Sequence, residues 1–258
     1  MNLKREHLAV NIIVCVKRVP DTETRIRIGE DGTSIDPSGV KFIISPYDEF
    51  AVEAALRTKE SSGEGEVTVI TVGDSAAQET LRAGLAMGAD KAVLLEGTST
   101  MDGLATAKTL AAELSDVDAP LILMGVKAAD DDQQQVGPMV GTLLERACVT
   151  GVTEFELGDG KVVCQREVEG GVEVVEAKLP ALLTITKGAY EPRYASLKGI
   201  MAAKRKPLEQ KEAQGAEGRL SVARYEYPPE RAAGKVVGEG PDAVPELVRL
   251  LREEANAL

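Results

Sequence analysis

The chain has few of the residues with which enzymes build a catalytic centre. It contains one histidine, His7, no tryptophan, and three cysteines, Cys15, Cys148 and Cys164, which form no CxxC pair. A Ser–His triad needs an imidazole, and a zinc site needs several closely spaced Cys or His ligands. The sequence therefore argues against both kinds of site, and the cysteines are expected to be small core hydrophobes.

Other absences narrow the class of protein. The net charge of −12 and the pI of about 4.8 leave no concentrated basic face for a nucleic acid. No apolar run reaches the ~20 residues of a membrane-spanning helix, and no signal-type apolar segment follows the N-terminus. Neither a GxGxxG after the first expected strand nor a GxxxxGK[ST] occurs. We therefore expect a cytoplasmic protein. If it binds a nucleotide, it does so without the two commonest nucleotide-binding motifs.

Strands and helices alternate through the first part of the chain. Apolar runs at 10–16, 66–72, 91–95 and 121–124 predict buried strands, and 45–59, 75–87 and 100–114 predict helices. Residues 24–28 and 41–44 alternate and predict a small β-ribbon. This order indicates a Rossmann-like α/β fold with a doubly wound, mostly parallel sheet. Alternating runs at 152–157, 161–168 and 172–177, around glycine turns at 158–160 and 170–171, add antiparallel strands, and 179–186 is a further buried strand.

The stretch 121–146 reads as a strand, a polar loop and a helix that begins near the boundary between Asp132 and Gln133. Such a helix start, beyond the carboxyl end of a buried strand, suits a phosphate, and Gln134 and Gln135 can add donors. The alternative is that the acids 130–132 only cap the helix. The loop offers no nucleophile or imidazole base.

Two further segments lie where a ligand would be expected. Ser45-Pro46-Tyr47-Asp48 has the pattern of a capping box, with Ser45 as N-cap and Asp48 reaching back. Residues 15–22 follow the first strand and form a candidate wall of the same pocket, or an ordinary strand-exit turn.

The last third of the chain divides into a loop and an arm. Residues 187–201, which we call the recognition loop, show no clean period around Arg193 and Leu197; a helix capped near Ser196 is the alternative. We expect residues 1–206 to form one α/β domain, which carries the candidate phosphate site, and 207–258 to form a polar arm. The arm ends in a short amphipathic helix with Val244, Leu247, Val248 and Leu251 on one face, which would pack on the domain or on a partner subunit.

Several blocks in order resemble one family: VKRVPDTETRIRI, ISPYDEFAVEAALRTKE, ETLRAGLAMGADKAVLL, GVKAADDDQQQVG, CQREVEGGVEVVEAKLPALLTIT and YEPRYASLKGIMAAKRKP. Over nearly its whole length the chain is similar to the beta subunit of electron-transfer flavoproteins. The resemblance implies an electron carrier subunit, not an enzyme. It implies a heterodimer with an alpha subunit that holds most of a redox-active FAD, and a structural AMP on the beta subunit. Acyl-CoA dehydrogenases and related flavin dehydrogenases would donate the electrons, and a membrane quinone oxidoreductase would accept them.

The resemblance also assigns residues. The AMP site would comprise Cys15, Ser45, Pro46, Tyr47, Asp48, Val72, Gly125, Asp131, Gln134, Gln135 and Val136. Arg193 would lie near FAD, and Glu167 near the subunit junction. Leu197 would insert into the partner dehydrogenase, with Tyr194, Ile200 and Met201 beside it.

Two positions depart from the family pattern. Thr22 stands where some members place a tyrosine beside the flavin, and Val136 stands where a threonine hydroxyl often reaches the phosphate. Bifurcating members hold a second FAD in place of AMP, usually with a glycine-containing loop, and the acids 130–132 look more like the AMP type. Two alternatives are a stand-alone regulatory domain similar to universal stress proteins and an adenylating enzyme, which needs a glycine- and serine-rich loop after the first strand.

Overall fold

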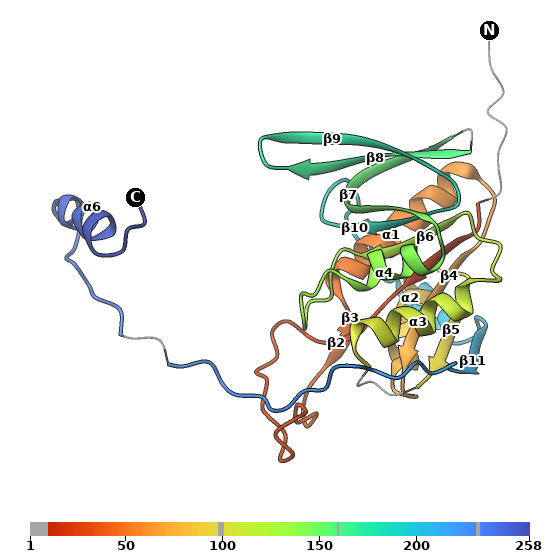
Figure 1. Cartoon of the computed structure of the whole chain (residues 1–258), viewed down its shortest axis with the longest axis horizontal. Helices are drawn as coiled ribbons and strands as arrows, with labels where there is room; N and C mark the ends of the chain where they lie inside the picture. Colours follow the sequence, from red (N-terminus) through yellow and green to blue (C-terminus); the bar gives the residue numbers. More distant parts are fainter. Residues whose placement is uncertain (1–9, 98–100, 159, 231–232) are drawn as a thin grey trace, which may run out of the picture.

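The computed structural model describes residues 10–97, 101–158, 160–230 and 233–258. Within these residues, one nine-stranded sheet has the order β11-β5-β4-β1-β6-β10-β7-β8-β9 (Figure 1). Neighbours from β11 to β7 pair in parallel, and β7, β8 and β9 pair antiparallel. The predicted α/β fold is therefore confirmed. The strands are β1 (Ile12–Cys15), β4 (Val67–Gly73), β5 (Lys91–Glu96), β6 (Leu121–Gly125), β7 (Ala147–Gly158), β8 (Lys161–Val168), β9 (Gly171–Lys178), β10 (Ala181–Ile185) and β11 (Leu208–Glu212).

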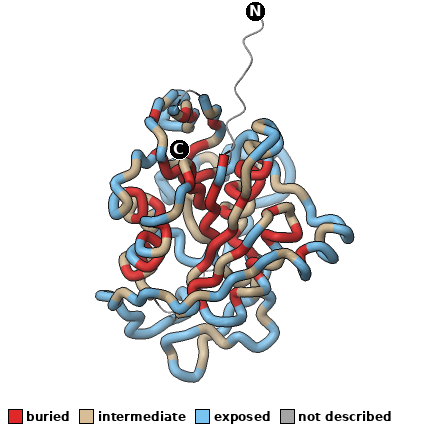
Figure 2. The backbone as a smooth tube through the Cα atoms, turned by 90° about the vertical axis from the view of Figure 1, so that its right-hand side faces the viewer, coloured by how far each residue is buried: buried red, intermediate tan, exposed pale blue. Residues whose placement is uncertain are grey.

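Helices cover both faces of the parallel part. α1 (Pro46–Ser62) and α2 (Ala77–Met87) bury one face, and α3 (Gly103–Leu114) and α4 (Val136–Leu143) bury the other. In β1, Ile12 and Val14 belong to the first core, whereas Ile13 and Cys15 belong to the second. Because both faces are covered, the strand is apolar at every position. The buried residues accordingly run through the middle of the body (Figure 2).

The predicted β-ribbon has a different partner. β3 (Phe42–Ile44) pairs antiparallel with β2 (Arg18–Pro20), not with residues 24–28, where the pairing is limited to one bridge between Ile28 and Ile35. The reason is burial: Val19 and Ile44 lie in the interior, whereas Ile26 is exposed. Residues 21–41 thus form a long excursion between the two short strands.

Three other expectations meet the limits of the described residues. The helix expected from Thr100 begins at Gly103, after Asp102, whose carboxylate accepts a hydrogen bond from Ala105 N. Thr100 itself, His7, and Asp159 of the first hairpin turn lie outside the described residues. The antiparallel strands on either side of that turn are present as predicted.

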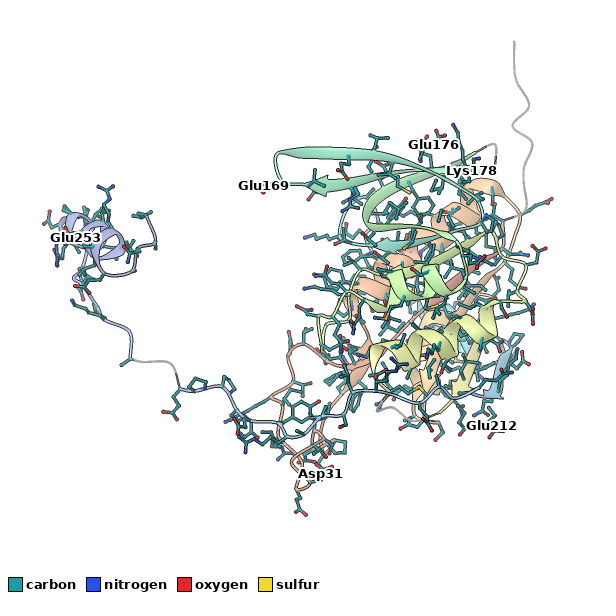
Figure 3. The ribbon with its side chains drawn as sticks, viewed as in Figure 1. Asp31, Glu169, Glu176, Lys178, Glu212 and Glu253 are labelled. Carbon is teal, nitrogen blue, oxygen red and sulfur yellow. The ribbon has the colours of Figure 1, made fainter. Side chains whose placement is uncertain are left out.

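The arm contributes one strand to the sheet before it leaves the body. β11 pairs in parallel with β5 at the sheet edge, and the sequence Leu-Glu-Gln-Lys-Glu gave no apolar alternation from which to predict it. A long segment without helix or strand follows, then η1 (Pro241–Ala243) and α6 (Val244–Glu253). α6 stands apart from the body, with Glu253 far from Glu212 of β11 (Figure 3). The short C-terminal helix is therefore confirmed.

Candidate functional site

Residues predicted for the nucleotide lie at the carboxyl ends of three neighbouring strands. Cys15 ends β1, Val72 is next to last in β4, and Gly125 ends β6. The sheet order places β1 between β4 and β6. In open parallel sheets, ligands bind beyond these strand ends. The structure thus brings together positions that are far apart in the sequence.

Asp48, in the first turn of α1, joins two of these strand ends. Its carboxylate accepts a hydrogen bond from Lys17 N at 2.7 Å, just after β1, and from Gly125 N at 2.9 Å, at the end of β6. Gly125 has no side chain because a Cβ there would run into the Asp48 carboxylate and the Tyr47 backbone. The first turn of α1 is therefore packed directly against the exit of β6.

The predicted capping box at the start of α1 is wrong in its hydrogen bonds. Ser45 precedes the helix, but its side chain makes no capping bond, and Asp48 reaches across to the strands rather than back. The physical reason is that the backbone N–H groups of Lys17 and Gly125 lie at the ends of buried strands, where they need hydrogen-bond acceptors. The Ser45 hydroxyl is fully buried and has no hydrogen-bond partner among the described residues.

Burial controls the protonation of this site. It raises the pKa of Asp48 to about 7, against the lowering effect of the two backbone N–H donors and of the Lys17 charge. Burial also raises the pKa of the Cys15 thiol, and the nearby Asp48 charge adds to the effect. Cys15 is therefore a protonated, inert thiol that packs in the core and supplies no nucleophile.

The three acids of the polar loop form ion pairs and do not cap a helix. Lys17 Nζ lies 2.8 Å from Asp130 and 2.9 Å from Asp131, and Lys127 Nζ lies 2.8 Å from Asp132. Lys127 also stands over the Tyr47 ring, at 5.4 Å from its centroid. The capping interpretation is wrong, because the acids fix the loop to the β1 exit and to the β6 exit.

α4 begins at Val136, later than the predicted boundary near Gln133. Asp132 and Gln134 have φ values of 51° and 56°, so the backbone cannot continue as a right-handed helix through them. The Gln135 amide donates to the Gln133 side chain and lies against Gly103 at the start of α3. Gln134 and Gln135 thus lie just before α4, and Val136 is its first residue. A phosphate was predicted at this helix start, and that role stays a prediction.

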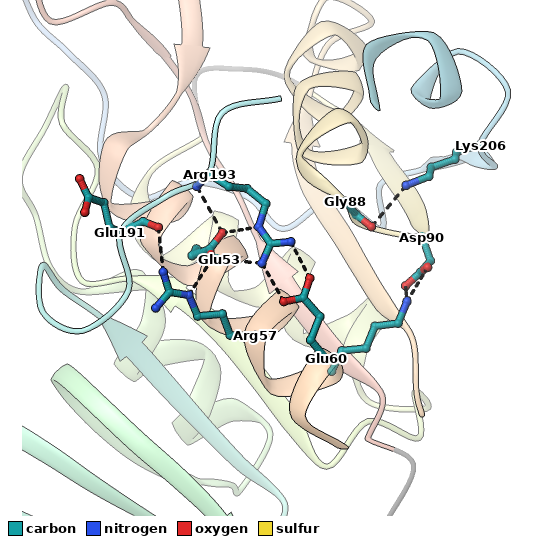
Figure 4. A network of polar contacts seen from close by, with 9 residues as sticks. Glu53, Arg57, Glu60, Gly88, Asp90, Glu191, Arg193 and Lys206 are labelled. Atoms are coloured by element: carbon teal, nitrogen blue, oxygen red, sulfur yellow. Dashed lines mark hydrogen bonds and ion pairs between the residues drawn. The ribbon is translucent and has the colours of Figure 1, made fainter. Parts of the chain in front are cut away.

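Arg193 is held by two carboxylates of α1 (Figure 4). Its Nε lies 2.7 Å from Glu53 Oε2, its Nη1 lies 2.5 Å from Glu60 Oε1, and its backbone N–H also donates to Glu53. Arg57 donates to Glu53 and to the carbonyl oxygens of Ala189 and Glu191. Burial acts to raise the pKa of Glu53, but hydrogen bonds from Arg193 and Arg57 outweigh it and hold that pKa below its ordinary value. We call Glu53, Arg57, Glu60 and Arg193 the α1 ion network.

Just beyond the α1 ion network, the recognition loop exposes apolar side chains. Tyr194 is 99% exposed and Leu197 is 78% exposed, and Ile200 and Met201 are also exposed. A short helix, α5 (Leu197–Ala203), begins here, and the Ser196 hydroxyl accepts from Gly199 N at 3.0 Å. The alternative of a capped helix near Ser196 is therefore confirmed, and it leaves Leu197 pointing outward.

Glu167 lies on a different part of the surface. It is in β8 and faces Val172 of β9, near the tip of the hairpin, where Val172 and Val174 are exposed. The hairpin projects beyond the body of the sheet (Figure 1). The structure does not place Glu167 with the nucleotide residues. Its predicted position near a subunit junction stays a prediction.

The α1 members of the ion network were not predicted from the sequence. Glu53, Arg57 and Glu60 follow one another at helical spacings of four and three, which puts them on one face of a helix. That signal was available. Their partner, Arg193, is 140 positions from Glu53, so no local pattern could have connected them.

The site has the chemistry of a binding surface. Among the described residues, no group of three or more His, Cys, Asp and Glu side chains is arranged to hold a metal ion. No described helix has the length and apolar character needed to cross a membrane. The strand ends offer backbone groups, carboxylates and amides that can bind and orient a ligand.

Comparisons with known proteins agree with the geometry. The sequence model of the electron transfer flavoprotein domain matches residues 33–215. The electron transfer flavoprotein subunit beta of Bacillus subtilis is 40% identical over 260 residues, covering 96% of this chain and 100% of that protein. The protein of the same name from Syntrophomonas wolfei is 38% identical over 94% of this chain and 92% of its own length. That from Sus scrofa is 38% identical over 93% and 96%, respectively. The chain belongs to the family of electron transfer flavoprotein beta subunits.

Proposed function

We propose that this beta subunit pairs with an alpha subunit that carries FAD, holds AMP at the strand ends, and docks on flavin dehydrogenases through its recognition loop. Electrons would pass from acyl-CoA dehydrogenases, or related enzymes, to a membrane quinone oxidoreductase. The protein would work in the cytoplasm. Under this proposal the chain is an electron carrier subunit and catalyses no bond-making step of its own.

The observation that carries the docking role is the exposure of Tyr194, Leu197, Ile200 and Met201 on one short segment. Four large exposed apolar side chains within eight residues are typical of a partner-binding patch. The segment is firmly attached behind them, by the α1 ion network and by the Arg82 guanidinium, which donates to Ala203 O at 2.6 Å. A small anchored patch of this kind suits a partner that must leave after each transfer.

Support for AMP comes from the donor set at the strand ends. The Ser45 hydroxyl is buried beside the site and has no hydrogen-bond partner among the described residues. Because buried polar groups are almost always hydrogen-bonded, this hydroxyl is a candidate donor or acceptor for a bound nucleotide. The residues that would hold AMP are those predicted: Cys15, Ser45, Pro46, Tyr47, Asp48, Val72, Gly125, Asp131, Gln134, Gln135 and Val136. Asp48 would position the site indirectly, because it fixes the backbone of Lys17 and Gly125.

When bound, FAD supplies the electron-transfer chemistry, and the protein supplies position and docking. On this chain, Arg193 is the residue expected near FAD, and its guanidinium is engaged by Glu53 and Glu60. We therefore assign Arg193 the role of a fixed support for the loop at the FAD side. Thr22 is exposed and offers no aromatic contact to a flavin.

Nucleotide analysis tests the cofactor part of the proposal. The chain would be coexpressed with its alpha subunit, and the purified complex denatured to quantify the released nucleotides. One FAD and one AMP per heterodimer would support the proposal. Two FAD and no AMP would indicate the bifurcating type, and the absence of a copurifying flavoprotein would favour a stand-alone nucleotide-binding domain.

Replacement of Leu197 tests the docking part. Leu197→Ala removes most of an exposed apolar anchor, so we expect the KM of an acyl-CoA dehydrogenase for the heterodimer to rise about tenfold, with kcat unchanged. The FAD absorption spectrum should not change, because the side chain points away from the body. Leu143→Ala, at an exposed leucine at the end of α4, serves as the matched control and should leave KM unaltered. Equal KM values for Leu197→Ala and the unmodified complex would exclude the docking role.

A further inference from the structure

The recognition loop has no regular structure between β10 and α5, yet both of its ends are fixed. At its start, the Tyr190 hydroxyl accepts from Phe155 N at 3.0 Å, and Ala189 N donates to Thr153 O at 3.0 Å. At its far end, α5 packs on α2, where Gly199 lies against the carbonyl oxygen of Ala86. The residues between these anchors carry the first exposed apolar side chain, Tyr194.

The α1 ion network holds this middle part. Glu53, whose side chain is 3% exposed, accepts from the backbone N–H and the guanidinium of Arg193. Arg57, on the same helix, donates to the carbonyl oxygens at both sides of Tyr190. Glu60 binds the other edge of the Arg193 guanidinium through two hydrogen bonds. The backbone from Ala189 to Arg193 is therefore attached to a rigid helix immediately before the exposed residues.

We propose that Glu53, Arg57 and Glu60 are positioning residues that hold the recognition loop in its docking conformation before a flavin dehydrogenase binds. The inference rests on the proposed docking function and adds to it the residues that keep the loop ready. An irregular segment loses conformational freedom when it is fixed, and that loss weakens binding if it occurs at the moment of docking. The network removes this cost in the free protein. Its four hydrogen bonds to Glu53 are charge-assisted, the strong class.

Two substitutions loosen the network without removing any exposed residue of the patch. Glu53→Gln keeps the shape of the side chain and removes its charge, and Glu60→Gln does the same at an exposed carboxylate, where folding is not at risk. In the heterodimer, we expect KM for an acyl-CoA dehydrogenase to rise about tenfold for Glu53→Gln and about threefold for Glu60→Gln, with kcat unchanged. Glu156→Gln, at an exposed glutamate of β7, is the control of equal charge change and should leave KM as it is.

Two further readouts separate positioning from a general loss of structure. Hydrogen exchange of the backbone amides from Glu191 to Ser196 should become faster in Glu53→Gln, while exchange in β1 and β6 stays slow. Glu53→Gln should also raise KM much less when Leu197 is already alanine, because the network acts through the presentation of that side chain. Additive effects of Glu53→Gln and Leu197→Ala, or an unchanged KM in both glutamine variants, would overturn the proposal. An unchanged KM in Leu197→Ala alone would instead show that the docking function itself is wrong, and the positioning role would fall with it.

Discussion

α1 carries two buried carboxylates with opposite surroundings. Asp48 is 6% exposed and accepts hydrogen bonds from two backbone N–H groups; Glu53 is 2% exposed and lies between two guanidinium groups. Burial raises the pKa of Asp48 to about 7, whereas hydrogen bonds from Arg193 and Arg57 overcome burial at Glu53 and lower its pKa. Both carboxylates lose contact with water, so the difference lies in whether a full positive charge replaces it.

The two carboxylates also hold different kinds of backbone. Asp48 binds the exits of β1 and β6, which the sheet already fixes through their pairing with each other. Glu53 binds the recognition loop, which has no ladder or helical hydrogen bonds of its own at Arg193. A neutral donor pair is enough where the main chain is rigid. The loop needs the stronger ionic contact, because without it the loop would have several conformations to choose from.

Arg193→Met breaks the contrast, because it leaves Glu53 buried with Arg57 as its one guanidinium partner among the described residues. We expect the free energy of unfolding to fall by about 3 kcal/mol at pH 7. In the unmodified protein, the lowered pKa of Glu53 gives stability above its ordinary pKa of 4.5 that is lost as the pH falls through the folded value. In the variant, burial dominates and the pKa rises, so the deficit should be smaller at pH 5 than at pH 7. Urea unfolding of the complex at both pH values measures it, and a deficit independent of pH would contradict this account.

Asp48→Asn sharpens the contrast from the other side. With a folded pKa of about 7 and an ordinary value of 3.8, Asp48 binds a proton in the folded state that the unfolded state has already released. Stability due to this group should therefore decrease as the pH rises from 4 to 7, by at most about 1.4 kcal/mol per pH unit. The Lys17 charge lowers the pKa of Asp48, and the Asp130 charge raises it. Asparagine cannot titrate. The free energy of unfolding of the Asp48→Asn variant should therefore rise relative to that of the unmodified protein between pH 5 and pH 8. Parallel pH profiles for the two proteins would refute the assignment.

The sequence predicted features that depend on local pattern. The run 10–16 that contains β1 is apolar at every position except Asn11, and this pattern predicted a strand covered on both faces. The placement of Cys15 and Gly125 at the same sheet edge followed from the alternation of strands and helices. The exposure of Leu197 was predicted from the resemblance to the family, and the pattern around it fitted a loop or a capped helix equally well.

What the sequence did not predict depends on contacts between distant residues. Asp48 had the correct spacing for a capping box, but Gly125 N, 77 positions away, takes its carboxylate. The acids 130–132 had the correct position for helix caps, but they form ion pairs with Lys17 and Lys127, which follow β1 and β6. In each case the local pattern identified the residue but not its partner. The partners lie at the ends of buried strands that are distant in the sequence, so a local pattern contains no information about them.

Two serines that precede helices give the smallest predicted effects and separate capping from ligand binding. Ser196 caps α5, so Ser196→Ala should lower the free energy of unfolding by about 1 kcal/mol. Ser45 precedes α1 but makes no capping bond, and its hydroxyl is buried without a partner among the described residues. Ser45→Ala should therefore leave the stability of the nucleotide-free protein unchanged, or raise it by less than about 1 kcal/mol. If the hydroxyl serves the nucleotide, the same variant should retain less AMP per heterodimer, whereas Ser196→Ala should retain as much as the unmodified complex. A loss of stability in nucleotide-free Ser45→Ala as large as that in Ser196→Ala would mean that the Ser45 hydroxyl is a structural cap after all.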